Sequence, residues 1–132
     1  MDPNCVDCGR KMTPFSNETM AVTYQNQSAE VSGLSGWRCA DCGEVEFDGA
    51  SAARYAAAGD TLILEARRKM GAELRRIRKK LGLNQAEAAK LTGGGHNAFS
   101  RYENGLIAPA PAVVNLFKLL EKHPEELERL AG

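Results

Sequence analysis

Between residues 81 and 105 the chain reads LGLNQAEAAKLTGGGHNAFSRYENG, and these residues predict the fold of the C-terminal half. Asn84, followed three residues later by Glu87, forms a capping-box pattern that predicts a helix from Gln85 to Thr92. Three glycines break that helix, and a second helix is predicted over residues 96–104, closed by Gly105. A helix, a glycine turn and a second helix form the arrangement of a DNA-binding helix-turn-helix. The sequence therefore predicts a nucleic-acid-binding module.

Helical patterns flank this stretch on both sides. Apolar residues at helical spacing predict a helix that ends at Gly82; they are Leu74, Ile77 and Leu81. Before it, the alanine-rich residues 51–68 predict another helix, interrupted at Gly59-Asp60, with Gly71 as a hinge. After it, Pro109 and Pro111 introduce a helix that Pro124 ends, and residues 125–130 predict a last short turn. The apolar face of that fourth helix is wide enough to predict a homodimer interface, together with the last turn; it comprises Val113, Leu116, Phe117 and Leu120.

The net charge of zero hides two halves of opposite charge. Residues 1–66 hold 4 Lys/Arg and 10 Asp/Glu, which gives −6, whereas residues 67–132 hold 13 and 7, which gives +6. A basic half favours nucleic acid as its partner, although two ordinary solvated surfaces would give the same count. No apolar run is long enough to span a membrane, and the N-terminus lacks a secretory signal, so we expect a cytoplasmic protein with reduced thiols.

Two Cys-x-x-C motifs, Cys5/Cys8 and Cys39/Cys42, lie in the N-terminal half. Each such turn points two sulfurs to one side, and two facing turns supply the tetrahedral all-sulfur cage that zinc prefers. Gly9 and Gly43 follow the two motifs and suit the tight turn that brings amides to the sulfurs. We therefore expect one structural Zn²⁺ per chain, because a segment this small and polar needs a metal to fold.

Other readings of the cysteines remain open. A catalytic zinc site would need an open coordination position, which four thiolates do not leave, so no enzyme is predicted. Two disulfides, or a thioredoxin-like redox pair, would fit a cytoplasmic chain less well. The residues between the motifs predict a small antiparallel sheet, with strands at Ala21–Tyr24 and Ala29–Val31 and another strand entered through a turn at residues 33–39.

The predicted fold class is an α+β zinc-binding module, residues 1–68, followed by an all-α helix-turn-helix domain, residues 69–132. Asn97 and Arg101 are four residues apart, so they project from one helix face, whereas Phe99 and Tyr102 fit the core better. Asn pairs with adenine and Arg with guanine, each discriminating by about 1–3 kcal/mol. We expect phosphate or sugar contacts from His96 and Ser100. The alternative is that Asn97 and Arg101 are ordinary solvated surface residues that do not contact DNA.

Residues 81–89 and 99–105 resemble the Cro/lambda-repressor type of helix-turn-helix. More narrowly, GGGHNAFSRYE at residues 93–103 resembles the signature of MqsA-type antitoxins, which join a four-cysteine zinc module to such a domain in this order. The resemblance implies that Asn97 and Arg101 read bases, and Gln85 resembles the glutamine with which Cro-type repressors touch the DNA backbone.

The same resemblance implies three partners. The C-terminal domain would dimerise on a palindromic operator in double-stranded DNA and repress its own operon. The acidic N-terminal domain would neutralise a cognate toxin, an mRNA-cleaving ribonuclease of the MqsR kind. The alternative is a stand-alone zinc-containing helix-turn-helix regulator.

Overall fold

The computed structural model describes residues 2–131. The chain divides into two compact units, Met1–Ile63 and Leu64–Gly132. The first holds the strands β1 (Thr13–Tyr24), β2 (Gln27–Arg38) and β3 (Val45–Phe47). The helix α1 (Gly49–Lys80) begins in the first unit and ends in the second, so the predicted boundary after residue 68 lies within it. The second unit adds five short elements: α2 (Gln85–Thr92), α3 (Ala98–Glu103), α4 (Pro111–Lys122), η1 (Pro124–Glu126) and α5 (Leu127–Ala131).

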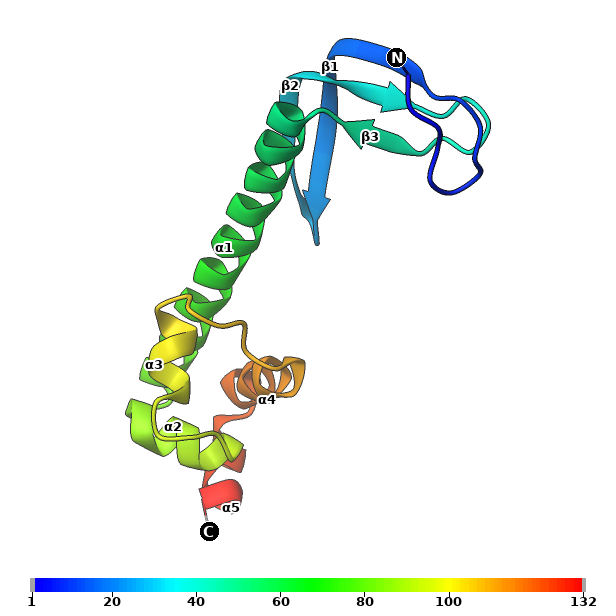
Figure 1. Ribbon diagram of the computed structural model, residues 1–132. Helices are drawn as coiled ribbons and strands as arrows, with labels where there is room; N and C mark the ends of the chain where they lie inside the picture. Colours follow the sequence, from blue (N-terminus) through cyan, green and yellow to red (C-terminus); the bar gives the residue numbers. More distant parts are fainter. Residues whose placement is uncertain (1, 132) are drawn as a thin grey trace. The chain divides into compact units, whose positions relative to one another are not determined.

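The three strands form one antiparallel sheet in the order β1-β2-β3 (Figure 1). Strands β1 and β2 make a long hairpin, with Thr13 opposite Arg38 and Tyr24 opposite Gln27. The predicted small antiparallel sheet is confirmed, but its strands are longer than expected. The turn predicted within residues 33–39 was wrong, because β2 continues from Gln27 to Arg38 without a break. An irregularity around Asn17, which has φ 52°, lets β1 continue through a polar stretch that shows no alternating pattern.

Side chains of the sheet and of the first half of α1 share one apolar cluster. Val22, Val31 and Leu34 from the sheet are buried together with Leu62 from the helix. Asp48 begins the helix, since its carboxylate accepts a hydrogen bond from the Ser51 amide at 2.8 Å. This cluster ties the hairpin to the helix within the first unit.

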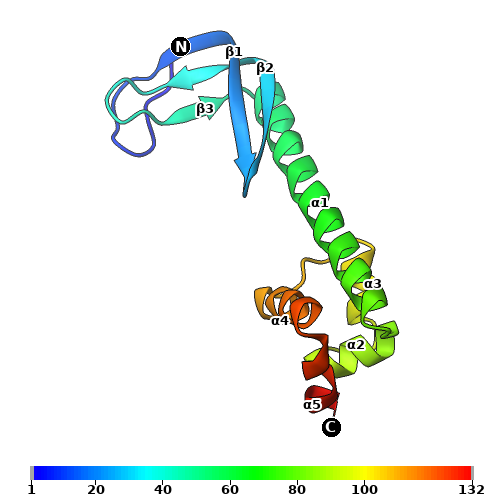
Figure 2. The ribbon, with the colours of Figure 1, turned by 180° about the vertical axis from the view of Figure 1, so that it is seen from behind.

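In the second unit, α2, α3 and α4 lie around the C-terminal part of α1 (Figure 2). All four helices contribute side chains to one buried core. Its buried members are Leu74, Ile77, Ala88, Ala89, Phe99, Val113 and Phe117. Helix α2 has the predicted bounds, and both hydrogen bonds of its capping box form, at 2.7 and 3.0 Å. The all-α unit after a sheet-containing one confirms the predicted fold class.

Most of the α4 face that we predicted for dimerisation is used inside this unit. Val113, Phe117 and Leu120 are buried, whereas Leu119 is 56% exposed. Periodicity shows that a face is apolar but not which neighbour covers it. The apolar side chains left for another protein are therefore fewer than the pattern suggested.

Helix α1 is continuous, so the predicted interruption at Gly59-Asp60 and the predicted hinge at Gly71 were both wrong. Gly71 serves packing: a Cβ there would lie 2.1 Å from the carbonyl oxygen of Tyr102 and 3.0 Å from its carbonyl carbon. These atoms belong to the backbone of α3 and cannot rotate away. The glycine therefore sets how closely α3 approaches α1.

Replacing Gly71 with alanine should destabilise the second unit by about 1–3 kcal/mol, because overpacking outweighs the helix propensity gained. Gly59→Ala in the same helix is the matched control, since its Cβ would meet only Val22 at 3.7 Å. That variant should be neutral or more stable by up to about 1 kcal/mol. Urea unfolding followed by circular dichroism compares the two, and equal stability of both variants would contradict the close approach.

Candidate metal centre and nucleic-acid interface

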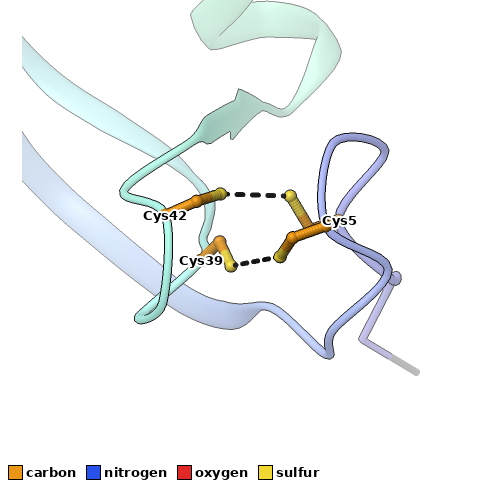
Figure 3. A group of neighbouring side chains, drawn as sticks. Cys5, Cys39 and Cys42 are labelled. Carbon is orange, nitrogen blue, oxygen red and sulfur yellow. Dashed lines mark hydrogen bonds between the residues drawn. The ribbon is translucent and has the colours of Figure 1, made fainter.

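The four cysteines form one group in the first unit. Their sulfur atoms all lie within 4.8 Å of one another, with Cys5 Sγ 3.5 Å from Cys42 Sγ and Cys8 Sγ 3.4 Å from Cys39 Sγ. Figure 3 shows Cys5 facing Cys39 and Cys42 from a separate loop. Four sulfurs around one tetrahedral metal with bonds of about 2.3 Å would be about 3.8 Å apart. The group is thus positioned to bind one metal ion.

The two cysteine turns have the same backbone geometry. The Gly9 amide donates to the carbonyl of Cys5 at 2.8 Å, and the Gly43 amide donates to that of Cys39 at 2.8 Å. Both glycines have a left-handed φ, 77° and 78°, which a side chain would disfavour. Each motif therefore builds its half of the group locally.

Backbone amides point at the sulfurs. The amides of Cys42 and Asp41 donate to the sulfur of Cys39 and hold its pKa at about 7. The Glu44 amide likewise lowers the pKa of Cys42. The adjoining thiols of Cys5 and Cys39 outweigh it and raise that pKa to about 12. The thiolate of Cys39 is thus favoured, and the thiol of Cys42 resists ionising beside it. Four thiolates at this spacing need a cation, which agrees with a metal site.

A small core supports the group from behind. Cys5 and Cys39 are buried with Met12, and Trp37 packs against them, whereas Cys8 and Cys42 are exposed. At the surface, Arg10 pairs with Asp41 across the two turns at 3.4 Å. So few apolar contacts cannot by themselves hold two loops together.

In the second unit, α3 buries one face and exposes another. Phe99 is fully buried, and its ring lies 5.4 Å from that of Tyr102 and 5.1 Å from that of Phe117. Asn97 and Arg101 are exposed, and the Arg101 amide donates to the Asn97 carbonyl at 3.1 Å. The helix is shorter than predicted, and Asn97 is the residue that precedes its first turn. The predicted split between core and exposed residues is confirmed.

Three of the residues expected to touch DNA share one shallow depression. His96, Asn97 and Arg101 line it together with Gly95, Ala98 and Ile107. Ser100 lies outside it, half-buried, and accepts a hydrogen bond from the Asn104 amide group at 3.4 Å. Gln85 is exposed at the first residue of α2 and does not line the depression either.

Two features of this region were missed from the sequence. Ile107 borders the depression, and its only signal was an apolar residue shortly after the glycine that ends α3. Arg78 carried no prediction of its own, yet it is buried and forms a two-pronged ion pair with Glu103. A helical charge pattern alone does not show which cation turns inward.

Comparison with known proteins decides the family. The family model for the antitoxin component of a bacterial toxin-antitoxin system, MqsA, matches residues 3–131. The chain belongs to the MqsA antitoxin family. It is 33% identical to Antitoxin MqsA of Escherichia coli (strain K12), over 96% of this chain and 98% of that protein. The resemblance inferred from GGGHNAFSRYE and the paired cysteine motifs is thereby confirmed.

Two regions of this antitoxin are candidates for its function. The metal-binding group lies in the first unit and the exposed face of α3 in the second. Among residues 2–131, no helix combines the length and apolar character that crossing a bilayer requires.

Proposed function

We propose that this antitoxin binds double-stranded DNA as a homodimer, represses its own operon and neutralises an RNA-cleaving toxin through its first unit. The observation that carries the DNA-binding part is the face of α3. An exposed amide and an exposed guanidinium, those of Asn97 and Arg101, line one depression on the second member of a helix-turn-helix. These are the side-chain types that pair with adenine and guanine edges in the major groove.

The surroundings of the pair support contacts to the DNA backbone. His96 lies in the same depression. We expect Ser100, on α3, and Gln85, exposed at the first residue of α2, to add contacts to the DNA backbone. The half of the chain that holds α3 carries a net charge of +6. Cationic surface attracts DNA regardless of sequence, so base reading is left to Asn97 and Arg101.

A footprint on the promoter of its own operon tests this function. The wild-type protein should protect two half-sites about one helical turn apart, as a symmetric dimer would. Asn97→Ala and Arg101→Ala should lose the footprint, each contact being worth about 1–3 kcal/mol. Asn115→Ala and Arg129→Ala, which replace exposed residues of the same types, are the matched controls and should keep it. Protection that survives in both α3 variants would refute the proposal.

Dimerisation is proposed through the C-terminal unit. Leu119 on α4 and Leu130 on α5 are 56% and 51% exposed, and they offer apolar surface that the unit itself does not cover. A single helix-turn-helix reads only a few base pairs, so a two-fold pair is the usual solution.

For the metal we propose zinc, with a structural role. The donor set is four sulfurs, and soft thiolates select zinc over magnesium or calcium. Four protein ligands complete a tetrahedral shell and leave no position for substrate. Zinc would lower the charge repulsion among the thiolates, while Cys5, Cys8, Cys39 and Cys42 would hold both turns in place.

The toxin is proposed to bind the first unit, whose excess of carboxylates suits a basic RNA-binding enzyme. Residues 1–66 carry a net charge of −6, which would steer such a partner toward them. Co-expression with the neighbouring gene product should yield a complex that dissociates at high salt more readily than at low salt. If no complex forms and no toxicity is relieved, the stand-alone regulator becomes the better description.

A further inference from the structure

The segment after α3 presents two apolar side chains to solvent. Leu106 is 65% exposed and Ile107 is 39% exposed, and neither belongs to the core cluster of the second unit. The backbone here is nonetheless held firmly. The Leu106 amide donates to the carbonyl of Arg101 at 2.9 Å, and the Gly105 amide donates to that of Tyr102 at 3.1 Å. The segment is therefore fixed to the end of α3.

Only one of these two apolar side chains lies at the depression beside α3. Ile107 lines the depression that also contains His96, Asn97 and Arg101, whereas Leu106 does not. Ile107 is thus a branched aliphatic group among residues suited to polar contacts. Ile107 lies outside the core cluster and is 39% exposed, so part of its side chain is available to contact another molecule.

The major groove offers one apolar group at its base edges, the C5-methyl of thymine. We propose that Ile107 contacts the methyl group of a thymine in each half-site and is a further specificity-determining residue of this antitoxin. The inference rests on the proposed function, in which α3 lies in the major groove. Asn97 and Arg101 then read hydrogen-bonding edges, and Ile107 reads a methyl beside them.

The size of the effect follows from the area of one methyl group. Burying one carbon of this kind contributes about 0.8 kcal/mol, which is about a fourfold change in affinity. A contact of this size adjusts preference at one base pair without deciding whether the protein binds at all.

Replacing thymine by deoxyuridine removes the methyl and leaves every hydrogen-bonding group in place. In fluorescence anisotropy on the footprinted operator, each thymine is replaced in turn, and wild type, Ile107→Ala and Leu106→Ala are titrated. At one position in each half-site, deoxyuridine should weaken wild-type binding about fourfold. Ile107→Ala removes the contact from both half-sites of the dimer, so it should weaken binding to unmodified operator about 15-fold and should show no further loss with deoxyuridine there. Leu106→Ala should keep the full deoxyuridine penalty.

Three results would overturn the inference. Deoxyuridine could have no effect at any position, or its penalty could remain unchanged in Ile107→Ala. Alternatively, Ile107→Ala could sediment as a monomer where wild type is a dimer, which would place Ile107 against a second copy of the chain. If wild type binds operator specifically and Asn97→Ala removes that preference, any of these results refutes only the thymine contact. If wild type does not prefer operator to scrambled DNA, the proposed function fails along with it.

Discussion

Removing the metal is expected to unfold both cysteine turns and to leave α2, α3 and α4 folded. A structural zinc site of this kind is worth about 10–16 kcal/mol in small metal-dependent modules at pH 7. The core behind the cysteines consists of Cys5, Cys39 and Met12, with Trp37 against it, and it cannot replace that contribution. The helical unit has its own core and should stay folded when the metal is removed.

Trp37 reports on this directly, because it is the only tryptophan in the chain. Chelation in the presence of a reductant should shift its emission to longer wavelength, while most of the helical circular dichroism signal remains. Cys39→Ser should resemble the chelated protein, and Ala40→Ser, an exposed neighbour in the same turn, should resemble wild type. Unchanged Trp37 emission after complete removal of a stoichiometric metal would show that the turns fold without it.

The second large effect is expected from the ion pair between Arg78 and Glu103. Two hydrogen bonds of 2.8 and 2.9 Å join the side chains, which are only 10% and 5% exposed, and Arg78 also donates to the Leu83 carbonyl at 2.9 Å. Glu103→Ala leaves a buried guanidinium without its partner and should cost about 3–5 kcal/mol of unfolding free energy. Since domains of this size are stable by about 5–15 kcal/mol, the loss is a large share.

An exposed pair supplies the control. Arg76 and Glu73 are 49% and 42% exposed, so Glu73→Ala should change stability far less. The double variant Arg78→Met with Glu103→Leu should recover most of the loss, because the apolar pair no longer buries a charge alone. Urea unfolding of the four proteins measures this, and a Glu103→Ala cost no larger than that of Glu73→Ala would contradict the buried pair.

Features set by neighbouring residues were predictable. The capping box of Asn84 and Glu87 defined the first residue of α2, because its hydrogen bonds span only one turn of chain. The two cysteine motifs predicted the sulfur group for the same reason, since each turn fixes its own two sulfurs. The family signature in residues 93–103 then linked these local motifs to a known order of modules.

Features set by distant residues were not predictable. Glycine at position 71 looked like a hinge, because nothing near it in sequence shows that the Tyr102 carbonyl needs its space. The inward turn of Arg78 depends on Glu103, and the exposure of Ile107 depends on where α3 ends. Tertiary packing determines the surroundings of Gly71, Arg78 and Ile107, and the sequence near each residue does not show that packing.

The central claim is that Asn97 and Arg101 distinguish one DNA sequence from another. The most direct test is the ratio of affinities for operator and for a scrambled duplex, measured at one fixed salt concentration. Wild type should prefer operator by at least about 10³-fold, and each alanine variant, which loses one base contact in each half-site, should reduce that ratio by at least about 30-fold. Asn97→Ala should keep its affinity for scrambled DNA, because phosphate attraction is untouched. An unchanged ratio in both variants would contradict the account.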